Sequence, residues 1–453
     1  MYAKKSMVAP RQFEYKQNNQ VFLLARQYFI KWMIVSLKRT LNLLDATSVG
    51  IGAIIGAGIF VVLGVAIGYA GPSIIISIII AGAVASFTAF SFAELGSAIP
   101  KEGGAYQFAY ELISPFGGFV VGCLWLFAQI VAGAAISLGF ASYFVAVFPM
   151  FSLKTVAVVA ALTLTGLNLI GIKKSATVNN IFVITKIAIL GLFIVFGIFQ
   201  INPQNYSPFI SNGLFGILQG AGFIFFAYLG FGRISTLGEE VKNPERTLPF
   251  SILIALVASI VIYVLTAVTA TGLQSYQILA QSGAPIAEAA KATGNFILVI
   301  AVSLGALIAT TSVLITNLIG SSRVAFAMAR NGQIPKSIAR VSSRFGTPYV
   351  SILAMGVLLT ILVSVLDLKQ TVAITSFAIL ATHLTVNLSA INLRKKIPNL
   401  AKFKVPFYPL IPSLGIVSCI ILMFSLPQES LVIATLVIAI VSILYLLRKH
   451  ASA

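Results

Sequence analysis

Apolar segments of about 20 residues recur along the chain from residue 47 to residue 447, and short polar segments separate them. Each apolar segment is long enough to cross the roughly 30 Å hydrocarbon core of a bilayer as a helix. The pattern therefore predicts an all-α integral membrane protein with twelve transmembrane helices. The predicted helices cover residues 47–70, 73–99, 115–148, 154–171, 177–200, 213–236, 248–272, 294–328, 348–366, 370–393, 408–426 and 430–447.

The composition supports this class. Hydrophobic residues make up 58% of the chain and charged residues 9%, which excludes a soluble globular domain. The net charge of +19 could indicate a nucleic-acid binder, but the charges follow the loops. With the N-terminus in the cytoplasm, 25 of the 30 Lys and Arg fall in inner segments and three fall in outer ones. This positive-inside distribution predicts a multi-pass protein of the cell membrane, with both termini cytoplasmic and no nucleic-acid partner.

The domain organisation follows from the same pattern. We expect a cytoplasmic N-terminal extension over residues 1–40, one transmembrane domain over 41–447 and a cytoplasmic tail over 448–453. No secretory signal is visible in the extension. Its apolar segment 21–37 contains Arg26 and Lys31, so it is either an interfacial helix or lies partly upstream of a true start at Met33. No function is assigned to residues 1–32.

Two of the predicted helices, the first and the sixth, are interrupted by glycines. The first reads Gly52-Ala-Ile-Ile-Gly56-Ala57-Gly58-Ile-Phe60, and the sixth reads Phe225-Phe226-Ala227-Tyr228-Leu229-Gly230-Phe231-Gly232. Unwound backbone at membrane depth is tolerated only where it is buried in protein or lines a cavity. Paired interruptions in corresponding halves indicate the binding site of a transporter. They predict a five-plus-five inverted repeat with broken helices one and six, and helices eleven and twelve outside it.

A set of motifs resembles the amino acid–polyamine–organocation transporter family, in the expected order over residues 40–447. The motifs are the two interrupted segments, Ala93-Glu94-Leu95 through Pro100-Lys-Glu-Gly-Gly-Ala-Tyr106, Glu239-Glu240-Val-Lys-Asn-Pro244, Arg323-Val-Ala-Phe-Ala-Met-Ala-Arg330-Asn-Gly332 and Lys402-Phe-Lys-Val-Pro406-Phe-Tyr-Pro409. Each motif alone is weakly specific, whereas the set is strongly so. The resemblance implies alternating-access transport of amino acids or related amines, and it extends to proton-coupled permeases and to the cationic amino acid branch.

The interruptions predict a site for a small-molecule amino acid. Unwinding after Gly56 leaves N–H groups at Ala57 and Gly58 free at the start of the following half-helix, where the helix dipole favours a carboxylate. Unwinding in the sixth helix frees carbonyl groups around Phe226, Ala227 and Leu229 for an ammonium group. The resemblance implies the same roles, adds Ile54 as a carbonyl donor and makes Phe226 an aromatic gate. The glycines could alternatively serve only close helix packing.

The charge of the substrate side chain is predicted from the absence of carboxylates in the central parts of the membrane helices. A cationic side chain in a low-dielectric site needs a carboxylate, and the central parts of helices one, three, six, eight and ten contain none. Gly232 stands where the resemblance places an acidic residue in some relatives, and Arg233 follows it. We therefore predict a neutral amino acid, with a cationic amino acid or a polyamine as the alternative. Arg233 either disfavours cations or forms an ion pair with Glu239 or Glu240.

Lys186 is the predicted coupling residue. It lies in the fifth helix, about nine residues or 14 Å from the inner boundary, too deep for its side chain to reach the interface comfortably. Intramembrane ionisable residues are functional candidates by default. The resemblance implies that this lysine occupies the place of a sodium ion and exchanges a proton, with backbone near Gly52 and the run Thr310-Thr311-Ser312 as partners. The alternative is a charged lysine that only ties helices together.

Other intramembrane polar residues carry weaker predictions. His383 and Asn387 share one helix face, and packing is favoured over a proton relay. Gln129 is expected near the pocket and Glu94 in a structural role, whereas Cys123 and Cys419 are read as buried apolar residues.

Other classes of function fit the sequence less well. Two His and two scattered Cys offer no metal, haem or nucleophile–base set, so no enzyme and no cofactor is predicted, and the proton gradient is the expected driving force. A glycine-rich phosphate-binding loop is also missing, which argues against direct use of ATP. A non-transporting amino-acid sensor is the alternative from another class. The oligomeric state is not predicted.

Overall fold

The computed structural model describes residues 40–451 except 102, 171–175, 239, 343–344 and 346, so the segment 21–37 lies outside it. The described chain is helical, and the described residues within 40–451 form one compact unit. Its α-helices are α2 (Leu43–Ile54), α3 (Leu63–Ala70), α4 (Ile74–Ala98), α5 (Ala105–Leu112), α6 (Pro115–Val147), α7 (Leu153–Ile170), α8 (Ala176–Ile198), α9 (Gly213–Ile224), α10 (Pro244–Leu273), α11 (Tyr276–Gln281), α12 (Pro285–Lys291), α13 (Phe296–Arg330), α14 (Tyr349–Val365), α15 (Leu368–Lys396), α16 (Leu410–Ser425) and α17 (Gln428–Ala451). The segments of other helical type are η1 (Gly58–Val62), η2 (Gly71–Ser73), η3 (Pro203–Tyr206), η4 (Phe225–Leu237) and η5 (Lys336–Ala339).

The outer helices present exposed apolar faces, as expected of helices that lie in lipid. On α17, exposed side chains recur every three or four residues at Val432, Leu436, Ile440, Ile443 and Leu447. Within the described residues, nine helical segments are long and apolar enough to cross a membrane, and α14 and α16 are shorter apolar helices. One of the nine, Leu43–Ala98, contains the first two predicted helices. The protein is therefore a multi-pass membrane protein, and the count of twelve helices stays a prediction.

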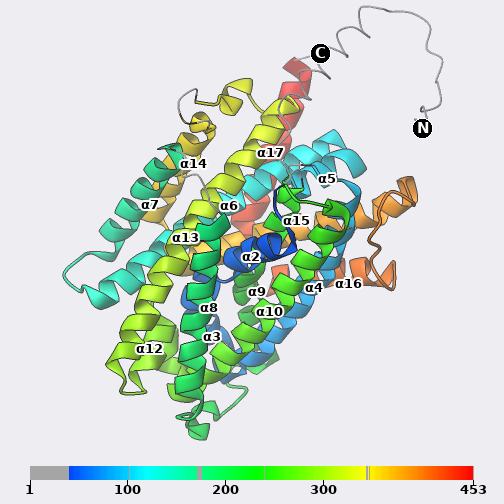
Figure 1. Cartoon of the computed structure of the whole chain (residues 1–453). Coiled ribbons are helices and arrows are strands. Elements are labelled where there is room, and N and C mark those ends of the chain that lie inside the picture. The colour runs from blue at the N-terminus through cyan, green and yellow to red at the C-terminus, as the bar shows by residue number, and fades with distance from the viewer. Residues whose placement is uncertain are drawn as a thin grey trace, which may run out of the picture. The chain divides into compact units, whose positions relative to one another are not determined.

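The first predicted interruption is present in the structure. α2 ends at Ile54, the backbone leaves the helical conformation at Ile55, and η1 begins at Gly58 with a wider π-type turn. In the sixth predicted helix, α9 ends at Ile224 and the tighter 3-10 segment η4 continues it. Both changes fall where the glycine patterns place them, and η1 packs directly against η4. Figure 1 shows α2 among α8, α10 and α13, which contact it.

The two interrupted helices are also joined near one end of each. Leu41, just before α2, forms a parallel bridge with Val241, just after η4. The N–H groups of Thr40 and Leu41 donate to the Glu240 carbonyl, and the Lys242 N–H donates to the Leu41 carbonyl at 2.8 Å. Asn42 then caps α2 in a reciprocal arrangement with Asp45. The first turn of α2 is thereby fixed to the end of η4.

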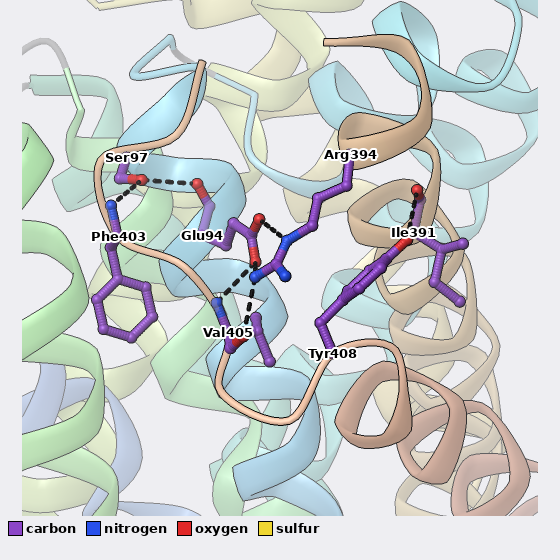
Figure 2. Close-up of polar contacts among 7 residues, drawn as sticks. All are labelled: Glu94, Ser97, Ile391, Arg394, Phe403, Val405 and Tyr408. Carbon is purple, nitrogen blue, oxygen red and sulfur yellow. Dashed lines mark hydrogen bonds and ion pairs between the residues drawn. The ribbon is translucent and has the colours of Figure 1, made fainter. Parts of the chain in front are cut away.

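A buried ion pair fastens the connection between α15 and α16 onto α4 (Figure 2). Arg394 donates to both carboxylate oxygens of Glu94, at 2.7 and 2.9 Å, and its guanidinium lies over the Tyr408 ring. The Val405 N–H donates to Glu94 and the Val405 carbonyl accepts from Arg394. Because Glu94 is fully engaged here, it has the structural role expected from the sequence.

Candidate functional site

The carbonyl groups that the end of α2 leaves without helical partners are met by side chains of other helices. Lys186, on α8, places its ammonium nitrogen 3.0 Å from the Gly52 oxygen and 3.1 Å from the Ile55 oxygen. The C-terminal end of a helix carries a partial negative charge, which favours a cation at this place. Lys186 is buried, so the contact is made inside the protein. The predicted partner near Gly52 is thus found. Thr310 and Ser312 donate to carbonyl groups of their own helix, and a contact of the run Thr310–Ser312 with Lys186 stays a prediction.

Tyr263, on α10, links the two interruptions and was missed by sequence reasoning. Its hydroxyl lies 2.7 Å from the Ile54 carbonyl oxygen and 3.1 Å from the Ala227 carbonyl oxygen. These two oxygens are predicted ligands of a substrate ammonium group. A hydroxyl has one proton and donates to one acceptor at a time, so the other oxygen keeps acceptor capacity. The sequence signal was a tyrosine inside an apolar helix, since a buried Tyr hydroxyl needs a partner.

The glycines of the interruptions lie where two backbones meet. A Cβ at Gly58 would overlap the Ala227 Cα, and a Cβ at Gly230 would overlap the Ala53–Ile54 peptide. A Cβ at Gly56 would overlap Val313 of α13. The structure therefore brings Gly56, Gly58 and Ala227 together with Ile54, and it does so through the close packing that was the alternative interpretation of these glycines.

The other predicted site residues lie along η1 and η4. Ala57, Phe226 and Leu229 are buried. Gly232 is partly exposed, and a Cβ at this position would contact the Phe92 ring. The Phe60 N–H of η1 donates to the Gly56 carbonyl at 3.3 Å, and free N–H groups at Ala57 and Gly58 stay a prediction. A second tyrosine missed from the sequence, Tyr143 of α6, donates to the Phe60 carbonyl of η1 at 2.6 Å.

Arg233 lies in η4 and joins it to α6 and α13. One of its terminal nitrogens donates to the side-chain oxygens of Gln129 at 2.9 Å and Asn317 at 3.0 Å, and the other contacts Thr316 at 3.4 Å. Of the two carboxylates considered from the sequence, Glu240 pairs with Arg323 at 2.6 Å, and Glu239 lies outside the described residues. Gln129 is thus placed beside Arg233.

His383 lies among three aromatic rings. The rings of Phe92, Phe225 and Phe231 are 5.2–5.6 Å from the imidazole, and its Nδ1 has no hydrogen-bond partner. Asn387, one turn further on, bonds to Ser91 and Thr88 of α4. These contacts agree with the packing role that the sequence favoured for His383.

Two membrane helices that change their geometry where they meet deep in a bundle, with backbone carbonyl groups from both on one side-chain donor, are typical of a membrane transporter. The family model of amino acid permeases matches residues 45–448, and the chain belongs to that family, as its motifs had indicated. It is 35% identical to the methylthioribose transporter of Bacillus subtilis over 92% of this chain and 95% of that protein. It is 33% identical to the branched-chain amino acid permease BcaP of the same organism, over 92% and 94%. The Arabidopsis thaliana cationic amino acid transporter 9 is 34% identical over 68% of this chain and 58% of that protein.

Proposed function

We propose that this protein is a secondary active transporter that takes up neutral amino acids, coupled to protons, by alternating access. The observation that carries the proposal is the convergence of the Ile54 and Ala227 carbonyl oxygens, from two different interrupted helices, on a single donor. A substrate ammonium group has three donors in a compact geometry and suits such a pair of acceptors.

In this proposal each predicted site residue has a defined part. The N–H groups of Ala57 and Gly58 receive the substrate carboxylate at the start of η1. The carbonyl groups of Ile54, Phe226, Ala227 and Leu229 receive the ammonium group, and the Phe226 ring acts as the gate. Gly56 and Gly232 leave room for backbone and substrate where a side chain would stand.

Lys186 is the proposed site of proton coupling. Its ammonium group satisfies the Gly52 and Ile55 carbonyls, so its charge holds the end of α2 to α8. Loss of its proton would weaken that attachment, because a neutral amine is a poorer donor to a helix C-terminus. A proton that binds and leaves Lys186 would then change how firmly the first interrupted helix is held.

The finer features of the fold belong to the same proposal. We infer twelve transmembrane helices with a five-plus-five inverted repeat, cytoplasmic termini and a place in the cell membrane. The lysine and arginine distribution and the positions of the two interruptions support this arrangement. The proton gradient takes the place of a cofactor.

The substrate class rests on charge and on the relatives. Two relatives that match over most of their length are named for a methylthioribose and for branched-chain amino acids, and neither name specifies a cationic substrate. A cationic amino acid or polyamine transporter is the second candidate, favoured by the relatives named as cationic amino acid transporters. A sensor that binds without transport is the candidate from another class.

Uptake into proteoliposomes tests the proposal. A panel of labelled amino acids is offered with and without an inward proton gradient, and we expect gradient-driven accumulation of leucine or other neutral amino acids. Uptake that ignores the gradient and needs preloaded substrate would identify an exchanger. Preferred accumulation of arginine or lysine would overturn the neutral class, and binding without any uptake would identify a sensor.

A further inference from the structure

We propose that Arg233 determines the charge class of the substrate: its buried guanidinium excludes positively charged side chains from the site between the two interrupted helices. This inference rests on the proposed function and names the residue that gives the site its selectivity.

Arg233 and the first interruption both contact α13, so this helix gives the distance between them. Val313 of this helix faces Gly56 in the first interruption. Thr316 and Asn317, which contact the guanidinium, lie three and four residues further along α13, or about 6 Å along its axis. A substrate side chain that extends from the interruption along α13 therefore approaches the guanidinium within a single helical turn.

Among the residues that the structure describes, no charged group neutralises the guanidinium. Its partners Gln129, Thr316 and Asn317 are uncharged, and its Nε has no hydrogen-bond partner. Among the ion pairs of the described residues, Arg233 takes part in none, while Glu94 pairs with Arg394 and Glu240 with Arg323. Arg233 is 8% exposed, so water screens its charge poorly. Buried charges are normally paired, and an unpaired one beside a binding site raises the electrostatic potential there.

The size of the effect is sufficient to set selectivity. With an effective dielectric constant of about 20, two unit charges about 8 Å apart repel enough to change a binding equilibrium by about 30-fold. A neutral side chain in the same place meets no such repulsion. A carboxylate near Arg233 would cancel most of it, and Gly232, the adjacent residue, provides none.

A purely structural role for Arg233 must be separated from this one, because Arg233 also ties η4 to α6 and α13. Three variants make the separation. Arg233→Gln removes the charge and keeps an amide donor for Gln129 or Asn317. Arg233→Lys keeps the charge and loses the planar fork. Gln129→Glu leaves Arg233 in place and puts a carboxylate of nearly the same shape 2.9 Å from it.

The measurement is the ratio of lysine to leucine uptake in proteoliposomes, with binding of both followed by thermal shift of the purified protein. We expect Arg233→Gln and Gln129→Glu to raise the ratio by about 10- to 30-fold, and Arg233→Lys to leave it near the wild-type value. An unchanged ratio in the two charge-neutralised proteins overturns the inference. If Arg233→Gln and Arg233→Lys both reduce the uptake of lysine and of leucine by the same factor, the inference is also overturned. That result is expected if Arg233 only holds the helices together. If Arg233→Gln does not fold, Gln129→Glu decides alone.

The wild-type protein separates this inference from the proposed function. If it transports no leucine or related neutral amino acid, the proposed function fails. If it transports leucine and the variants keep its selectivity, the function stands and the role of Arg233 fails.

Discussion

The hydroxyl of Tyr263, on α10, lies 2.7 Å from the carbonyl oxygen of Ile54, the last residue of α2 before the first interruption. The same hydroxyl lies 3.1 Å from the Ala227 carbonyl oxygen. In the proposed mechanism a substrate ammonium group uses these oxygens, so tyrosine and substrate act as donors to the same pair. The two donors need not exclude each other, since a carbonyl oxygen has two lone pairs.

Tyr263→Phe removes the donor and leaves the carbonyl groups. We expect the substrate-free protein to lose about 1–3 kcal/mol of stability, which is the cost of a buried acceptor without a partner. The substrate-bound protein should lose less, because the ammonium group supplies donors. Thermal unfolding with and without substrate measures both. Tyr206→Phe is the matched control, since Tyr206 donates to the Val268 carbonyl away from the site, and its loss should be equal in the two states. If Tyr263→Phe lost the same stability with and without substrate, Tyr263 and the substrate would not share these acceptors.

Lys186→Arg tests proton coupling with the charge kept. An arginine still donates to the Gly52 and Ile55 carbonyls, but it does not release its proton in a protein. We expect the variant to bind substrate and to exchange it across the membrane, while gradient-driven accumulation is lost. Counterflow and pH-jump uptake in proteoliposomes separate the two activities. Accumulation that still follows the proton gradient would return Lys186 to a structural role.

Gly58→Ala tests the contact between the interrupted helices. The new methyl group would overlap the Ala227 backbone, so one helix must move, at a cost of about 1–3 kcal/mol. We expect uptake to be lost and the melting temperature to fall. Gly191→Ala on α8 is the control, because nothing lies within 4 Å of its Cβ position. In that helix the substitution should be neutral or stabilising. Normal uptake by Gly58→Ala would show that the contact is dispensable.

Glu94→Gln tests the ion pair at the α15–α16 connection. The change leaves Arg394 without an anionic partner, and one of the groups that donate to Glu94 loses its acceptor. We expect the free energy of unfolding to fall by about 2–4 kcal/mol. Glu111→Gln, in the exposed pair with Lys101, should cost under about 1 kcal/mol. Chemical or thermal unfolding in detergent gives both values. The ratio of lysine to leucine uptake should stay unchanged in Glu94→Gln, and a shift in it would place Glu94 in the substrate pathway.

The sequence was informative where one residue type has a strong local effect. Glycine patterns predicted two interruptions. The structure confirms the first, where Ile55 leaves the helical conformation, whereas at the second the helix stays continuous and tightens from α to 3-10 geometry at Phe225. The two longest apolar segments became the two longest helices, α6 and α13. Lys186 stood out because a lysine is rare at that depth.

The partners of these residues could not be predicted, because they come from distant segments. Tyr263 is 209 residues from Ile54, and Arg233 meets Gln129 at a separation of 104. Neither contact leaves a periodic trace in the sequence. The short helices α11 and α12 were also missed, since their residues form a polar connection between two membrane segments. Local propensity is a weak guide in such a connection, and packing decides the outcome.

The reciprocal packing of Gly58 on Ala227 and of Gly230 on the Ala53–Ile54 peptide has a consequence for protein engineering. At both glycines the two helices are in direct backbone contact. A larger residue would therefore push the helices apart, and glycine already has no side chain that could be shortened. Substitutions that change the substrate must therefore be sought on the neighbouring helices α6, α13 and α15, which contribute side chains rather than backbone.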